Sequence, residues 1–163
     1  MKALGNILIV ILVTVVGMAG NAWSQENTAD RNELQGEFLM DFIIDTETAQ
    51  TIGGRRIVPI TGGRFEGPNL VGTVLNVGAD WIKTRADGVS ELDVRVTLKT
   101  DDEALIYMSY SGILSRSETG TYWRVVPKFE TDAEKYRYLN NLIAIGIGKR
   151  IDGKTAYSIY KIL

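Results

Sequence analysis

The chain has 163 residues, a formal net charge of −2, and neither cysteine nor histidine. Without cysteine it has no disulfides and no thiolate chemistry, and without histidine it has no Ser-His-Asp catalysis and no imidazole metal ligands. The weakly acidic balance, with no basic patch interleaved with aromatic residues, argues against nucleic-acid binding. The sequence also contains no EF-hand spacing, and we expect no metal or other cofactor.

The first 24 residues have the features of a secretory signal peptide. Lys2 precedes an unbroken apolar run over 7–16, and Ala22-Trp23-Ser24 fits the small-x-small rule of a cleavage site. The run is shorter than the ~20 residues of a membrane-spanning helix. We therefore predict cleavage after Ser24, a periplasmic or secreted mature protein, and membrane contact only through the transient signal. An uncleaved anchor is the alternative.

The remaining chain divides into a polar tail over 25–33 and a single domain over 34–163. Period-two alternation opens the domain and predicts a half-buried strand. The apolar face of this strand would carry Leu34, Phe38, Met40, Phe42 and Ile44. A short β-branched run follows in 51–60, where Pro59 indicates a strand end or a sheet edge.

The central part of the domain predicts several more strands. Residues 70–77 and 80–85 are expected as two strands separated by a turn at Gly78-Ala79. Residues 90–100 alternate most cleanly between apolar and polar positions, which is typical of a strand with one buried face. Further strands are expected over 104–112 and 121–126.

The last part combines a helix with a hairpin. Thr131 and Glu134 have the spacing of a capping box, which predicts one short helix near Thr131–Asn141. Strands over 142–148 and 156–163 would form the final hairpin. About eight to ten short strands predict an all-β fold, and we favour a small antiparallel β-barrel because closure removes exposed edges. Such a barrel can hold one small ligand.

Two acid–arginine pairs are candidates for a site. Arg64 and Glu66 lie two residues apart in GGRFEGPN, and Asp93 and Arg95 do so in the strand over 90–100. Residues i and i+2 of a strand share a face, so each pair should stand side by side. Alternation does not show which face lines a cavity. The pairs are therefore either solvated or register-fixing salt bridges, or charged partners within a binding site.

Asp80 has two interpretations. It is either a turn or capping residue after Gly78-Ala79, or a carboxylate at a barrel mouth, where the apolar neighbour Trp81 would raise its pKa and suit it to acid–base work. The candidate catalytic residues are Asp80, Glu66 and Arg95. The candidate ligand-binding residues are Arg64, Trp81, Asp93, Tyr107, Tyr122 and Arg124. Aromatic side chains line small-molecule pockets, but they also fill cores.

Several separated blocks of the domain have a familiar pattern: GGRFEGPNLVGTV, GADW, ELDVRVTLKTDDEALIYMSYSG, TYWRVVPKFET and YLNNLIAIGIGKR. From about Glu37 to Leu163 the chain resembles the bacterial family called domain of unknown function 3237, also described as uncharacterised protein family 0311. Both acid–arginine pairs belong to this pattern. The resemblance implies a small antiparallel β-barrel and no established activity. The export signal is a departure from the many relatives that look cytoplasmic.

Three functions fit these residues. We favour a cofactor-independent enzyme of the isomerase, lyase or cyclase type, acting on a small organic ligand that enters the barrel mouth. Arg95 or Arg64 would hold an oxyanion, and Asp80 or Glu66 would move a proton. The alternatives are a non-catalytic periplasmic binding protein for a small apolar or aromatic ligand, and a structural or interaction domain. The sequence also allows an oligomer.

Overall fold

The computed structural model describes residues 33–163. The predicted signal peptide and all but the last residue of the predicted tail lie outside the described residues. Within the described part, no helix has the length and apolar character needed to cross a membrane. The residues from Leu34 to Leu163 form one compact unit.

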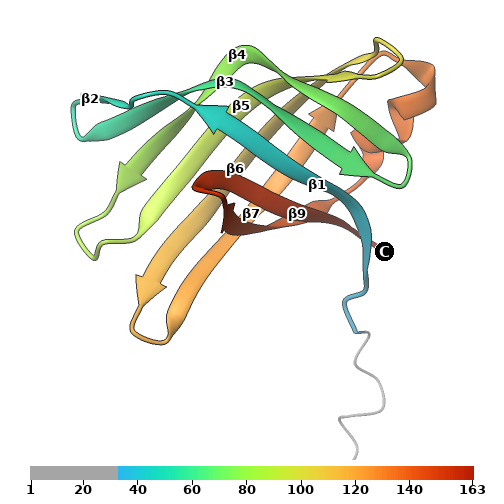
Figure 1. The fold of residues 1–163 in the computed structure, drawn as a ribbon. Coiled ribbons are helices and arrows are strands. Elements are labelled where there is room, and N and C mark those ends of the chain that lie inside the picture. Colours follow the sequence, from blue (N-terminus) through green and yellow to red (C-terminus); the bar gives the residue numbers. More distant parts are fainter. Residues whose placement is uncertain (1–32) are drawn as a thin grey trace, which may run out of the picture. The chain divides into compact units, whose positions relative to one another are not determined.

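An antiparallel barrel makes up this unit, as predicted (Figure 1). Within residues 33–163 the strands are β1 (Gly36–Thr46), β2 (Gln50–Ile52), β3 (Arg55–Gly67), β4 (Leu70–Thr84), β5 (Ser90–Thr100), β6 (Leu105–Ser117), β7 (Gly120–Glu130), β8 (Ala144–Ile151) and β9 (Lys154–Ile162). Pairing of β1 with both β9 and β3 closes eight of them into a barrel, and β2 is an extra strand on β3.

The strands form where the sequence alternates, and the apolar positions point inward. In β5 the alternate residues Leu92, Val94, Val96 and Leu98 are all buried, whereas Glu91, Asp93 and Arg95 lie on the outer side. Burying apolar side chains on one face of each strand gives the barrel a continuous core. That core includes Phe42, Phe65, Met108 and Tyr157.

The predicted inner face of the first strand is correct only in part. Met40, Phe42 and Ile44 are buried, but Phe38 is partly exposed and Leu34 precedes the strand and is exposed. The register between β1 and β9 shifts between Phe38 and Met40. A shift of this kind changes the face on which the following side chains lie, so the alternation does not extend back to Phe38.

The predicted turn at Gly78-Ala79 is wrong, because β4 runs continuously from Leu70 to Thr84. Gly78 instead lies at a bulge, where five residues of β4 (74–78) are opposite three residues of β5 (96–98). Its φ is +152°, and a Cβ atom there would lie 2.2 Å from the carbonyl oxygen of Arg95. Only glycine fits this close approach, so the bulge depends on that residue.

Pro59 also differs from its predicted place, since it lies inside the long strand β3 rather than at a strand end or sheet edge. It pairs with Ala79 just before the register between β3 and β4 becomes irregular. A bulge is one of the few positions inside a sheet that tolerates a residue without an N–H donor.

One end of the barrel is covered by the 3-10 helix η1 (Glu134–Asn141). Its side chains Tyr136 and Leu139 are buried in the same core as the strands. The predicted helix is present, but the capping box is not, because Thr131 has other partners. Its hydroxyl donates to the Leu105 carbonyl at 2.7 Å and accepts from the Ala133 amide at 3.1 Å.

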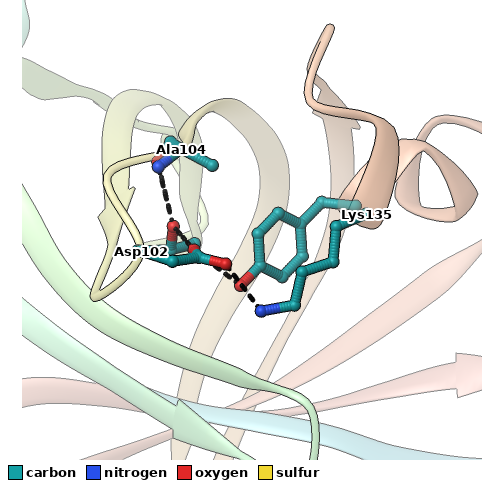
Figure 2. A network of polar contacts seen from close by, with 5 residues as sticks. Asp102, Ala104 and Lys135 are labelled. Atoms are coloured by element: carbon teal, nitrogen blue, oxygen red, sulfur yellow. Dashed lines mark hydrogen bonds and ion pairs between the residues drawn. The ribbon is translucent and has the colours of Figure 1, made fainter.

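A polar network fastens η1 to the β5–β6 turn (Figure 2). The carboxylate of Asp102 accepts hydrogen bonds from the Tyr136 hydroxyl at 2.9 Å, from Lys135 Nζ at 2.6 Å, and from the Thr100 hydroxyl. These three donors, with Lys135 first, hold the pKa of Asp102 well below its usual range. The covered end is therefore held by both apolar burial and charge-assisted hydrogen bonds.

Candidate functional site

The β4–β5, β6–β7 and β8–β9 turns lie at the barrel end opposite η1 (Figure 1). Residues beside these turns line a cavity. Its volume is about 540 Å³. Its walls combine apolar side chains such as Ile44, Ile82, Leu92 and Leu114 with the indole of Trp123. Four arginines also line it, and Asp80 is the single carboxylate among its lining residues.

Asp80 lies inside the barrel wall and not at a turn. It is in the middle of β4, two residues after the Gly78 bulge, and it is directly opposite Val58 of β3 and the buried Val94 of β5. Burial raises the pKa of its carboxyl group to about 7, while the Asp93 backbone and the charge of Arg56 oppose the rise. The structure thus excludes the turn or capping interpretation.

An aromatic cluster lies beneath the cavity. The ring of Tyr157 is 5.4 Å from that of Trp123 and 5.3 Å from that of Tyr110, both edge-to-face, and it stacks on Phe42 at 6.2 Å. Burial is the main cause that raises the pKa of both tyrosines, and the charge of Asp80 raises each further. The charge of the Asp80 carboxylate thus acts on both phenols.

Gly148 makes room for this cluster. A Cβ atom at this position of β8 would lie 2.3 Å from the indole ring of Trp123. The indole therefore packs directly on the β8 backbone and forms a flat wall of the cavity.

Three polar atoms of this region are buried: Asp80 Oδ1, the Tyr110 hydroxyl and Trp123 Nε1. In the described residues Asp80 Oδ1 has no hydrogen-bond partner, whereas the Tyr110 hydroxyl and Trp123 Nε1 lie near the Tyr157 hydroxyl without the geometry of a full hydrogen bond. Each such atom costs about 1–3 kcal/mol, and buried polar groups in native proteins are nearly always paired. The cavity thus contains one acid or acceptor (Asp80) and one donor (Trp123), and Tyr110 lies in the aromatic cluster that adjoins them. This is the arrangement expected of a site that binds a small polar-ended molecule.

Four of the predicted ligand-binding residues lie elsewhere, in a groove on the outer face of β4–β7. This groove has a volume of about 740 Å³, and its lining includes Trp81, Asp93, Tyr122 and Arg124. Two of its lining residues contact the neighbouring Arg95: Asp93 and Arg95 form an ion pair at 3.1 Å, and the guanidinium of Arg95 lies 5.3 Å from the centre of the Trp81 ring. Arg124 lies over Tyr122 at 5.0 Å.

The remaining predicted residues are also on the outer surface. Arg64 and Glu66 share an exposed face of β3, as predicted, and line a separate hollow with Asp41 and Lys149. Within the described chain, however, no ion pair joins Arg64 to Glu66. Tyr107 lies on the outer face of β6, opposite Glu130. Of the predicted site residues, Asp80 therefore lies in the barrel cavity, and the others lie outside it.

Sequence reasoning missed Tyr110, Trp123 and Tyr157, and the cavity arginines. Trp123 lies between Tyr122 and Arg124 in β7, on the opposite face from both. The alternation identified the two faces but not which of them lines the cavity. The sequence did contain a signal for the cavity arginines. Arg56, Arg116 and Arg150 each lie next to a turn, which places them near an end of the barrel. Within residues 33–163, no group of three or more acidic side chains is placed to hold a metal ion.

The family model described as protein of unknown function (DUF3237) matches residues 34–162, which is nearly all of the described barrel. The chain belongs to this family. A family member from Clostridium acetobutylicum, named UPF0311 protein, is 32% identical over 125 residues, covering 68% of this chain and 79% of that protein. The crystal structure of a β-barrel-like protein from Acinetobacter baumannii has a TM-score of 0.73 and 33% identity, covering 83% of this chain and 99% of that one.

This DUF3237 chain is also similar to proteins described as enzymes. The hydroalkoxylation enzyme phnH of Penicillium herquei is 34% identical over 106 residues, covering 64% of this chain and 62% of that protein. A crystal structure of an enzyme from Penicillium herquei has a TM-score of 0.66 and 26% identity, covering 80% of this chain and 95% of that one.

Proposed function

We propose that this DUF3237 protein is a cofactor-independent enzyme that moves protons on a small organic molecule bound inside the barrel, with Asp80 as its general acid and base. The observation that carries the proposal is that Asp80 and Trp123 place buried polar atoms in the lining of one cavity, with the Tyr110 hydroxyl in the adjoining aromatic cluster. A carboxyl group with a pKa of about 7 is present in both protonation states at neutral pH, which suits it to both roles.

Intramolecular addition of a hydroxyl group to a conjugated alkene is a reaction that these groups can perform. The Asp80 carboxylic acid donates its proton to the carbonyl oxygen of an enone as the hydroxyl oxygen attacks the β-carbon. A C–O bond forms at the β-carbon, and the double bond shifts to lie between the α-carbon and the protonated carbonyl carbon, which gives an enol. The carboxylate then takes the proton of the attacking hydroxyl. The enol tautomerises to the ketone, so the product is an isomer of the substrate.

The other two polar groups would stabilise the charge that develops. Trp123 Nε1 is a buried donor in the cavity wall, and the Tyr110 hydroxyl is a second buried donor in the adjoining aromatic cluster. A hydrogen bond from a buried donor to the carbonyl oxygen, as it gains charge during the addition, is stronger than in water. The phnH enzyme, a hydroalkoxylation enzyme by name, is similar in sequence over 64% of this chain. This similarity supports an addition reaction of this class. The polar atoms of the cavity are a second, independent line of support for it.

The test uses 2′-hydroxychalcone, whose phenol adds to its own enone to give a flavanone. The protein is incubated with this compound and with ring-substituted analogues at pH 7, and the rate and the enantiomer ratio of the flavanone are measured. We expect an enantiomeric excess with wild-type protein and a racemic background with Asp80→Asn. Asp132→Asn, which alters an exposed carboxylate beside η1, should behave as wild type.

Two outcomes contradict the proposal. Racemic product at the buffer rate across the series would do so, and so would an enantiomeric excess that Asp80→Asn retains. Saturable binding of the chalcones without turnover would favour the alternative of a ligand-binding protein.

We also propose that the enzyme acts outside the cytoplasm, on the basis of the signal-like composition of residues 1–24. N-terminal sequencing of the protein purified from its native cells should begin at Gln25. A start at Met1 in a soluble cytoplasmic fraction would contradict this location.

A further inference from the structure

The rim of the cavity carries an excess of positive charge. Arg56 of β3, Arg116 of β6 and Arg150 of β8 all line it, and Arg55 borders it as well. These residues come from strands at different positions around the barrel, so the cavity is bordered by arginines on more than one side. The single lining carboxylate, Asp80, lies deeper and is largely buried.

Within residues 33–163, none of these arginines forms an ion pair with a carboxylate, although Arg85 and Arg95 do, at 2.6 Å and 3.1 Å. Neighbouring acids at the same end have other partners, since Asp87 pairs with Arg85 and Asp45 pairs with Lys154 at 2.6 Å. Glu118 and Asp152 lie in the turns beside Arg116 and Arg150, but within the described barrel neither forms an ion pair with them, so the positive charge at the opening is not neutralised by direct contact. Such a charge attracts anions and raises their local concentration.

Arg150 is held in a fixed position. Its Nη1 donates to the Thr155 hydroxyl at 2.9 Å and to the Gly153 carbonyl at 3.3 Å, and its guanidinium lies 5.5 Å from the centre of the Trp123 ring. A guanidinium held by one nitrogen keeps its other donors free. Because its side chain is already ordered, binding a planar oxyanion costs less conformational entropy.

Arg56 connects the rim to the buried acid, because its charge lowers the pKa of Asp80. Positive charge at the opening, an indole wall and a proton-exchanging group further in are thus arranged along one cavity.

From this arrangement we propose that the substrate is an amphipathic carboxylate, whose anionic group binds at the rim to Arg150 and its neighbours and whose aromatic or alkenyl body lies against Trp123. The inference rests on the proposed function, since it assigns a substrate class to the same cavity. A carboxylate matches the guanidinium fork in geometry and charge. The charged end fixes the direction in which the molecule enters, so that the opposite end approaches Asp80.

The test compares 4-carboxy-2′-hydroxychalcone with its methyl ester, which has the same body without the charge. Isothermal titration calorimetry with wild-type protein should give a dissociation constant for the acid about tenfold lower than that for the ester, because one charge-assisted contact contributes about this factor. Added salt should weaken binding of the acid but not of the ester.

Variants of the rim locate the effect. Arg150→Gln should raise the dissociation constant of the acid about tenfold and leave that of the ester unchanged. Arg150→Lys, which keeps the charge but not the fork, should give an intermediate value. Arg137→Gln, an exposed arginine of η1 at the other end of the barrel, should bind both compounds as wild type. Thermal melts check that each variant is folded.

Equal affinities of wild-type protein for acid and ester, or no binding of either, would overturn the inference. Equal effects of Arg150→Gln and Arg137→Gln would do the same. Failure of the proposed function looks different, since the calorimetric preference does not require turnover. A preference for the acid that is lost in Arg150→Gln, with racemic flavanone only, would remove the catalytic proposal and leave the carboxylate site.

Discussion

Replacing Asp80 with asparagine should make the stability of the barrel less dependent on pH. Burial raises the pKa of this carboxyl group from 3.8 to about 7, so between these values the folded protein holds a proton that the unfolded chain has lost. Folding is therefore favoured by this group below pH 4, and that contribution is lost as the pH rises to 7. Because one pKa unit is equivalent to ~1.36 kcal/mol, the rise in the pKa of Asp80 from 3.8 to about 7 corresponds to about 4 kcal/mol of free energy of unfolding.

The measurement is urea unfolding followed by tryptophan fluorescence, at steps from pH 4 to pH 8, for wild-type protein, Asp80→Asn and Asp132→Asn. The free energy of unfolding of Asp80→Asn, minus that of wild type, should increase by about 4 kcal/mol across this range. Other titrating groups are common to both proteins and cancel in the difference. Asp132→Asn, which removes an exposed carboxylate, is the matched control for loss of an acidic side chain. Parallel curves for wild type and Asp80→Asn would refute the assigned burial of the carboxyl group.

Two further predictions concern the frame around the site. Leu139→Ala should lower the free energy of unfolding by about 2–5 kcal/mol, because this side chain of η1 is 1% exposed in the core. Tyr138→Ala, at an exposed neighbouring position, should change it far less. Urea unfolding measures both variants, and equal losses would contradict the role of η1 as a packed cover. Gly148→Ala should displace the indole of Trp123 and lower the free energy of unfolding by about 1–3 kcal/mol. Fluorescence emission measures the displacement, and thermal melting measures the loss of stability. An unchanged spectrum and melting temperature would contradict the packing of the indole on β8.

Much of the fold could be predicted because the local signals agree with the global structure. The alternation in 90–100 corresponds to β5, and the turn residues around Asp152-Gly153 lie between β8 and β9. The errors occur at bulges. Gly78 has the composition of a turn, but the extended strands on either side continue through it, and only the close contact with the Arg95 backbone explains the glycine.

The site was harder to predict, because alternation separates two faces of a strand without naming the inner one. Asp93 and Arg95 form the expected kind of pair, yet both are about half exposed on the outside of the barrel. Asp80 was a candidate because of its chemistry. The burial of Asp80 and its position near Tyr110 and Tyr157 depend on which strands become neighbours when the barrel closes. Local sequence patterns do not contain that information.

The cover formed by η1 also has a kinetic consequence. Tyr136 and Leu139 fill the far end of the barrel, so any molecule in the cavity enters and leaves through the arginine-lined rim. In the proposed reaction, product and substrate would then exclude each other, and product inhibition should be competitive. A molecule longer than the cavity would insert only one end, and the rest of it would remain in solvent. Selectivity would thus depend on the chemistry of that end and on its distance from the charged group, and much less on total size.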